Sequence, residues 1–272
     1  MEKFPVSILL CLLCSPGYSR YVYEFEDLPP LMQAAGNGDL DEVKRLISDG
    51  ANYDDTALGL NAWVYSALFM AFGRGQYEVA NFLVKRGANV NQKYRRGNTI
   101  LMMAVVKQNL DFAKLLIKHG ADVNARSMDI IDTALMRAVY KENIDMVALL
   151  IEKGARVTTQ SRVTGNAALN MVVDPLYCTP SPSLLAGDKC TDIAALLIKH
   201  GADINKRDDN LYTPLMNAVR NGNEKLATLL INKGADVTLK HINGETALVF
   251  AVEKWGEDHP VVTLLKNRET NM

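Results

Sequence analysis

Features that indicate catalysis or a cofactor are scarce in this sequence of 272 residues. It has four cysteines, four histidines and two tryptophans, and its formal net charge is −1. It contains no Gly-x-Ser-x-Gly elbow, no His-Glu-x-x-His pair and no phosphate-binding Gly-Lys-Ser/Thr loop. No set of acidic residues, histidines and cysteines has the spacing of metal ligands. We therefore expect a protein that is not an enzyme, with no cofactor, metal or small-molecule substrate, and the near-neutral charge does not point to nucleic acid.

Long hydrophobic runs are also missing, with one exception at the N-terminus. Residues 4–14 form an apolar run of 11, which is too short to span a bilayer but suits the core of a signal peptide. Small residues at Gly17 and Ser19 predict cleavage before Arg20. We therefore predict a signal peptide over 1–19 and a lead-in over 20–27. The alternative is an apolar N-terminal strand or helix of the mature fold.

What the sequence has instead is a repeat. The pair Gly-Ala recurs at 50, 87, 120, 154, 201 and 234. A second motif keeps step with it, as in "TILMMAV", "TALMRAV" and "TPLMNAV". The Thr of this motif is suited to cap a short helix, and the Gly provides the left-handed residue with which a second helix ends.

These motifs resemble those of the ankyrin repeat, and more specifically of exported, periplasmic bacterial ankyrin-repeat proteins. The resemblance implies an all-α repeat solenoid over 28–272, in which each unit has a helix-turn-helix and a β-turn or hairpin finger. The family's motif His is replaced here, mostly by Met, so we expect that position to pack instead of hydrogen-bonding. About seven repeats are expected, at 28–60, 61–93, 94–126, 127–160, 161–207, 208–240 and 241–272, the last as a C-terminal cap.

The resemblance also implies a concave binding face made of fingers and inner helices. The residues at its outward positions are rich in Arg, Lys, Tyr and Met, a composition similar to that of protein interfaces. Because basic residues dominate among them, we expect one protein partner with an acidic or mixed-charge surface. Trp63 and Tyr65 either anchor this partner or only cover the edge of the first unit. The predicted contact residues are Trp63, Tyr65, Met70, Arg74, Tyr94, Arg95, Arg96, Met103, Lys107, Arg126, Met128, Arg137, Tyr140, Lys141, Arg162, Tyr212 and Arg220.

Three functions are consistent with such a module. The first is an immunity protein or inhibitor that binds a secreted toxin or effector in the bacterial periplasm. The second, also implied by the resemblance, is a periplasmic helper in oxidative defence associated with a catalase. If the leader is not cleaved, a translocated effector or an intracellular ankyrin scaffold is the third. We expect a monomer, because capped solenoids have no structural need to assemble.

The fifth repeat is interrupted by the segment "DPLYCTPSPSLLAGDKCTD", residues 174–192. Counted between its motif Leu and its Gly-Ala exit, this repeat has an insertion of 13 residues, placed between its two helices. Once the leader is removed, Cys178 and Cys190 are the remaining thiols. In an oxidising compartment they are expected to form a disulfide worth about 2–3 kcal/mol. The alternative is two reduced, incidental cysteines.

Overall fold

The computed structural model describes residues 28–58, 64–173 and 186–270, and within these ranges helices dominate. Residues up to Asn89 and residues from Val90 onward form two compact units, which are described in turn. The expected fold class, a helical repeat solenoid, is confirmed. The predicted 13-residue insertion falls largely outside the described residues.

The first unit holds two helix pairs and a short hairpin. Helix α1 begins with Pro30, whose fixed φ suits the first helical position, and is followed by Gly38 in the left-handed conformation. The side chain of Asp39 caps α2 by accepting a hydrogen bond from the Glu42 N–H at 3.0 Å. Strands β1 and β2 pair antiparallel directly before α3. The elements are α1 (Pro30–Asn37), α2 (Leu40–Ser48), β1 (Thr56–Leu58), β2 (Val64–Ser66), α3 (Ala67–Gly73) and α4 (Tyr77–Lys85).

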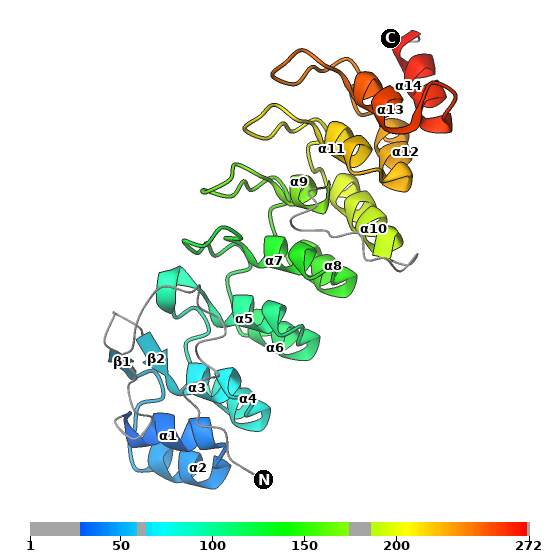
Figure 1. The fold of residues 1–272 in the computed structure, drawn as a ribbon. Coiled ribbons are helices and arrows are strands. Elements are labelled where there is room, and N and C mark those ends of the chain that lie inside the picture. The colour runs from blue at the N-terminus through cyan, green and yellow to red at the C-terminus, as the bar shows by residue number, and fades with distance from the viewer. Residues whose placement is uncertain (1–27, 59–63, 174–185, 271–272) are drawn as a thin grey trace, which may run out of the picture. The chain divides into compact units, whose positions relative to one another are not determined.

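The second unit contains five helix pairs among its described residues. In Figure 1 the two helices of each pair lie side by side, for example α7 and α8. A 3₁₀ turn, η4 (Arg95–Gly97), precedes the first pair. The pairs are α5 (Ile100–Val106) with α6 (Leu110–Lys118), α7 (Ala134–Tyr140) with α8 (Ile144–Glu152), α9 (Ala168–Val173) with α10 (Ala186–Lys199), α11 (Pro214–Arg220) with α12 (Glu224–Asn232), and α13 (Ala247–Trp255) with α14 (Pro260–Thr270).

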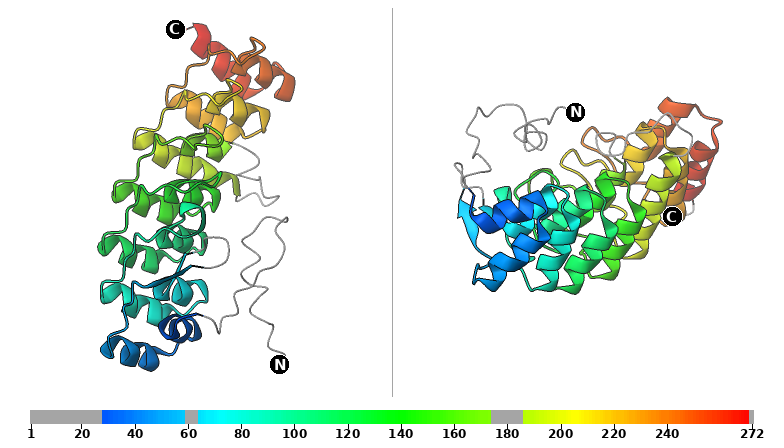
Figure 2. Two further views of the ribbon diagram at one scale, coloured as in Figure 1. Left: turned by 90° about the vertical axis from the view of Figure 1, so that its left-hand side faces the viewer. Right: turned by 90° about the horizontal axis from the view of Figure 1, so that it is seen from below.

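These helices form two layers in the second unit. The first helices of the pairs, α5, α7, α9, α11 and α13, pack on one another in order, and the second helices, α6 to α14, do the same (Figure 2). Alanines at the centre of the first helices, such as Ala104, Ala138 and Ala218, are fully buried and leave room for close packing. The second helices end as the repeat predicted, with a Gly at positive φ, as at Gly120 (φ 85°) and Gly154 (φ 89°).

The position of the family's missing His is buried in the middle repeats, as expected, but not in the last one, where Val249 is 40% exposed. Met102, Met136 and Met216 are each 1% exposed and fill the space between neighbouring first helices. Asn170 keeps a polar role there, because its Nδ2 donates to the carbonyl of Lys206 at 2.9 Å. The Met216 sulfur also accepts a hydrogen bond, from the Thr213 N–H at 3.4 Å. Packing therefore dominates at this position, but two of its residues also hydrogen-bond.

Helix α10 begins earlier than the motif indicates. In the fifth repeat the segment that matches the second helices of the other repeats, "CTDIAALLIKHGAD", starts at Cys190, whereas the helix starts at Ala186. Four residues of the predicted insertion therefore extend the helix. Cys190 itself is 3% exposed, and Cys178 lies outside the described residues, so the disulfide stays a prediction.

Candidate functional site

Five loops precede the first helices of the second unit, and we call them fingers. They comprise residues 93–98, 126–133, 160–167, 207–213 and 240–246. Each is closed by a backbone hydrogen bond, for example from the Ser127 N–H to the Asp132 carbonyl at 2.9 Å and from the His241 N–H to the Glu245 carbonyl at 3.0 Å. Figure 1 shows the fingers before α7, α9, α11 and α13 extending from the same side of the helices.

Threonine caps join the fingers to the first helices. The hydroxyls of Thr99, Thr133 and Thr213 accept the N–H of the residue three positions on, at 3.4, 3.1 and 3.2 Å. Thr246, before α13, makes no such side-chain bond. Because the cap fixes where a helix begins, the fingers before α5, α7 and α11 enter their helices in the same way.

A buried polar network connects the first two fingers to α7. Arg137, whose side chain is 15% exposed, donates from Nη2 to Asn98 Oδ1 at 2.6 Å, to Ser127 Oγ at 3.2 Å and to Asp129 Oδ2 at 3.0 Å. Asn98 Nδ2 in turn donates to Asp129 Oδ2 at 2.8 Å. Burial lowers the pKa of the Arg137 guanidinium, and its hydrogen bond to Asp129 opposes that shift. The network therefore fixes both fingers relative to the helix.

A second ion pair lies at the base of the finger 126–133. The side chain of Asp132 is fully buried, and its Oδ2 accepts hydrogen bonds from the Arg126 guanidinium, including one from Nε at 3.1 Å. The same carboxylate oxygen accepts the backbone N–H of Arg162 from the next finger at 3.3 Å. Arg126 also donates to the carbonyl of Gln160 at 2.5 Å. Adjacent fingers are thus held together by charge-assisted hydrogen bonds.

Comparison with known proteins agrees with this architecture. A family model described as ankyrin repeats, three copies, matches residues 6–94, 68–161 and 183–272. The chain belongs to the ankyrin repeat family. Ankyrin repeats indicate a module for protein–protein interaction, and ankyrin repeat domains are typically binding modules without catalytic activity.

Solved ankyrin repeat structures resemble the chain over most of its length. The ankyrin repeat domain of Bcl-3, a member of the IκB protein family, is 25% identical over 88% of this chain and 99% of its own, with a TM-score of 0.70. An ankyrin repeat domain from Acinetobacter baumannii AYE is 27% identical over 76% of this chain and 98% of its own, with a TM-score of 0.66. The human ASB11 ankyrin repeat domain shares the fold. It is 23% identical over 89% of this chain and 98% of its own, with a TM-score of 0.62.

The predicted contact residues of the first unit have mixed outcomes. Trp63 lies outside the described residues. Tyr65 is half-buried on β2, with its ring 5.7 Å from that of Phe69. Met70 is 4% exposed and packs with Leu28 in the core, so its assignment to a contact surface was wrong. Arg74 is half-buried, and burial lowers the pKa of its guanidinium.

Several predicted contacts of the ankyrin fingers also face inward. Tyr94 is 5% exposed and cannot contact a partner through most of its surface. Arg137 and Arg126 are held by Asp129 and Asp132, which the motif positions did not reveal. Arg96 is exposed but also pairs with Asp129, Nε to Oδ1 at 3.4 Å. Two carboxylates thus pair with these three arginines, so most of the expected excess of basic charge there is neutralised within the fold.

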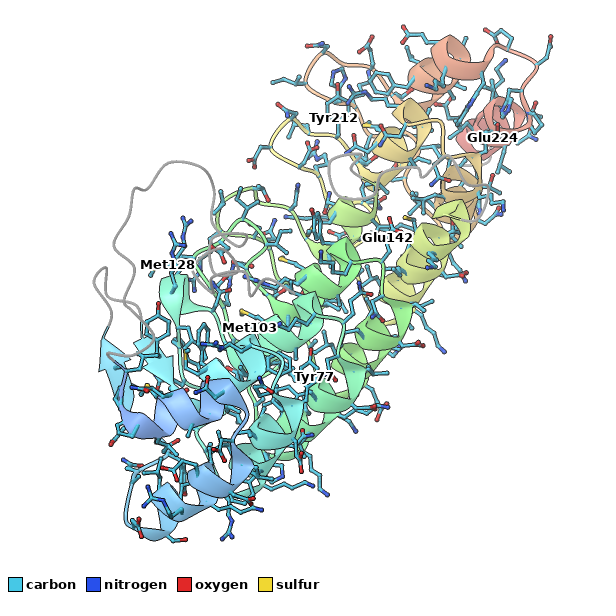
Figure 3. All side chains as sticks on the ribbon, turned by 60° about the horizontal axis from the view of Figure 1, so that its bottom comes forward. Tyr77, Met103, Met128, Glu142, Tyr212 and Glu224 are labelled. Carbon is cyan, nitrogen blue, oxygen red and sulfur yellow. The ribbon has the colours of Figure 1, made fainter. Side chains whose placement is uncertain are left out.

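The other predicted residues are at least partly accessible. Met128 is 71% exposed at a finger, and Tyr140 is 41% exposed at the end of α7, where the Lys141 ammonium lies 5.3 Å from its ring. The Arg220 guanidinium stacks over the ring of half-buried Tyr212 at 4.3 Å. In Figure 3, Met128 and Tyr212 lie toward the fingers, whereas Glu142 lies by the turn between α7 and α8. The remaining four are Arg95 and Met103, both half-buried, and Lys107 and Arg162, both exposed.

The motif analysis missed three exposed apolar residues of the fingers. Val163 is 58% exposed, Leu211 37% and Ile242 67%. Ile130, at 53%, accompanies Met128 in the preceding finger. Their signal was visible as apolar residues inside turns that are otherwise mostly polar. We call Met128, Ile130, Val163, Leu211 and Ile242 the apolar tip row.

Two other kinds of site, a membrane-spanning helix and a metal centre, are missing from the described ranges. None of the helices in 28–58, 64–173 and 186–270 combines the length and apolar character that crossing a bilayer requires. Those ranges also hold no group of three or more His, Cys, Asp or Glu side chains placed to bind a metal ion. The accessible residues of the fingers and of the first helices, among them Met128 and Tyr140, form the candidate site.

Proposed function

We propose that the protein is an exported, non-enzymatic ankyrin module that binds one protein partner through the fingers and first helices of residues 90–272. In the specific form of this proposal, it is an immunity or inhibitor protein of the bacterial periplasm that occludes a secreted toxin or effector. It acts as a monomer and needs no cofactor.

The placement of exposed apolar side chains supports a binding role. Nine large hydrophobic residues are exposed in the described parts of the chain, and five of them belong to the apolar tip row. Apolar side chains that gather on one set of loops, instead of scattering singly, mark an interaction surface. Tyr140 and Arg220 add an aromatic ring and a guanidinium on the first helices, both enriched in interfaces.

Two features of the sequence support export to the periplasm. The apolar run over 4–14 suits a signal peptide cleaved near Ser19–Arg20. Cys178 and Cys190 would then be the two thiols of the mature chain, and an oxidising periplasm would pair them. Mass spectrometry of the soluble protein from its native host tests export, because an intact Met1 would contradict it.

Affinity capture from the native periplasm tests the immunity role. The mature chain should retain one toxin or effector, and a variant with Tyr140→Ala and Lys141→Glu should lose most of it. These two residues are preferable to Arg137, whose substitution would break the buried network. Glu152→Ala with Lys153→Glu, on the second helix α8, is the matched control. Capture of a catalase instead would favour the oxidative-defence alternative, and equal capture by both variants would contradict the assigned surface.

A further inference from the structure

We infer that the apolar tip row docks a segment of another protein in which apolar side chains alternate with acidic ones. This inference rests on the proposed binding function and specifies the partner chemistry of the same site. Two observations support it. The first is which charged side chains of the fingers are paired within the fold and which are exposed, and the second is the backbone conformation of Leu211.

Four of the five acids of the fingers contact a partner within the fold. The five fingers contain seven Lys and Arg residues and five Asp and Glu residues. Asp129 and Asp132 pair with arginines, and Asp208 accepts the N–H groups of Asn210 and Tyr212, both at 2.9 Å. Glu245 lies 3.5 Å from buried His241. Only one finger acid, Asp209, is exposed and makes no hydrogen bond or ion pair among the described residues.

The cations of the last three fingers are turned outward. Arg162, Arg207 and Lys240 are all exposed, and within the described part of the chain their side chains form no ion pair. Each lies in the same finger as one member of the apolar tip row, Val163, Leu211 or Ile242. A partner that buries these apolar side chains must also face the cations. Acidic side chains flanking apolar ones satisfy both requirements.

Leu211 has a backbone conformation that an apolar side chain disfavours. Its φ is +63°, in the left-handed region that favours glycine. The corresponding turns of the neighbouring fingers use glycine, with Gly165 at φ +67° and Gly244 at φ +88°. A leucine here strains the backbone although 37% of its surface stays exposed, so packing within the fold explains it only in part. Strain held at an exposed apolar residue indicates a functional contact.

An anionic membrane could also attract apolar and basic side chains, but the fingers fit it less well. Recognition of anionic lipid uses clusters of about four to eight Lys and Arg residues. The last three fingers offer three outward cations, with exposed Asp209 among them. We therefore commit to a protein segment and make lipid binding an outcome of the test.

The test selects peptides from a random dodecapeptide library displayed on phage, with the mature full-length protein as bait. We expect the recovered peptides to be enriched in Asp and Glu and in Leu, Ile, Met and Phe. The dissociation constants of the synthesised peptides are then measured by fluorescence anisotropy. Leu211→Ala, and separately Arg162→Glu combined with Lys240→Glu, should each weaken binding about tenfold. Higher salt should weaken it as well.

Two matched controls should leave the dissociation constant unchanged. Ile144→Ala removes an equally exposed apolar side chain, 36% against 37%, at the start of α8. Lys199→Glu with Lys233→Glu reverses two exposed cations at the ends of second helices. Leu211→Gly separates contact from strain. It should bind as weakly as Leu211→Ala while resisting urea better, because it relaxes the backbone but also lacks the side chain.

Several results would overturn the inference. These are recovered peptides without acidic enrichment, failure to recover any binder, unchanged binding by the Leu211→Ala variant, or recovery of wild-type binding in Leu211→Gly. Sedimentation with phosphatidylglycerol vesicles, lost in the same variants and stronger than peptide binding, would assign the row to lipid instead. If peptides bind as expected but periplasmic capture finds no toxin, the immunity role fails while the tip row stands.

Discussion

The buried ion pair between Arg126 and Asp132 should dominate the stability of the finger 126–133. The perturbation is Arg126→Met, which keeps much of the side chain's bulk and removes its charge. The Asp132 side chain is fully buried, and without Arg126 its Oδ2 keeps only the Arg162 N–H at 3.3 Å. The buried carboxylate would then lack a hydrogen-bonded counter-charge, and only the electrostatic attraction of Arg137 would remain.

Removing one partner of a buried ion pair costs about 3–5 kcal/mol, because the remaining charge is desolvated. We expect Arg126→Met to lower the free energy of unfolding by that amount. Asp132→Asn should cost less, about 1–3 kcal/mol, since the Arg126 side chain is 28% exposed and can be hydrated. In the Asp132→Asn background no carboxylate is left at position 132 to lose its partner, so Arg126→Met should then cost only about 1 kcal/mol.

Urea unfolding followed by circular dichroism measures all four members of this cycle. The control is Arg45→Met in the first unit, where Arg45 also forms two ion pairs of 2.7 Å but is 59% exposed. Exposed ion pairs contribute little, so this variant should unfold almost as the wild type does. The reasoning is refuted if Arg126→Met destabilises no more than Arg45→Met, or if its cost is the same in both Asp132 backgrounds.

Three further predictions concern caps, strain and the cysteines. Thr133→Ala should lower the free energy of unfolding by about 1 kcal/mol because it removes a cap bond of 3.1 Å, and Thr246→Ala should cost less because Thr246 makes no such bond; urea unfolding compares them. Gln108→Gly should raise the unfolding free energy by about 0.5–1 kcal/mol in the same assay, since Gln108 has φ +55°, and a decrease would contradict this. A thiol assay on the unfolded, non-reduced mature protein should find no free Cys178 or Cys190, and a count of two would exclude the disulfide.

The fold could be predicted from the sequence because the residues that start and end its helices act locally. Thr133 caps its helix and Gly154 ends the next one through bonds to residues only a few positions away. A repeat multiplies each such signal, so the helix pairs and their fingers follow from the motif alone. The start of α10 at Ala186 could not be predicted, since the inserted residues have no counterpart in the other repeats.

The candidate site was predicted less well, because exposure and pairing depend on neighbouring repeats. Arg137 occupies an outward motif position, yet it bonds to Asn98, 39 residues earlier in the chain. Met70 becomes buried because Leu28 and Met32 pack against it. Neither contact leaves a trace in the motif. The apolar finger residues, in contrast, could be identified from the sequence, because Leu211 and Ile242 lie in turns, which need no apolar side chain.

We expect the inward-turned arginines still to contribute to binding, through the shape of the surface that they support. Arg137 bonds to Asn98 in one finger and to Ser127 and Asp129 in the next, and Met128 lies between those last two residues. A side chain that is 71% exposed is thus mounted on a backbone held by a buried network. Holding loops in their bound conformation lowers the entropy lost on association. We therefore expect the residues assigned by motif to contact to divide into those that contact a partner and those that hold the fingers in place.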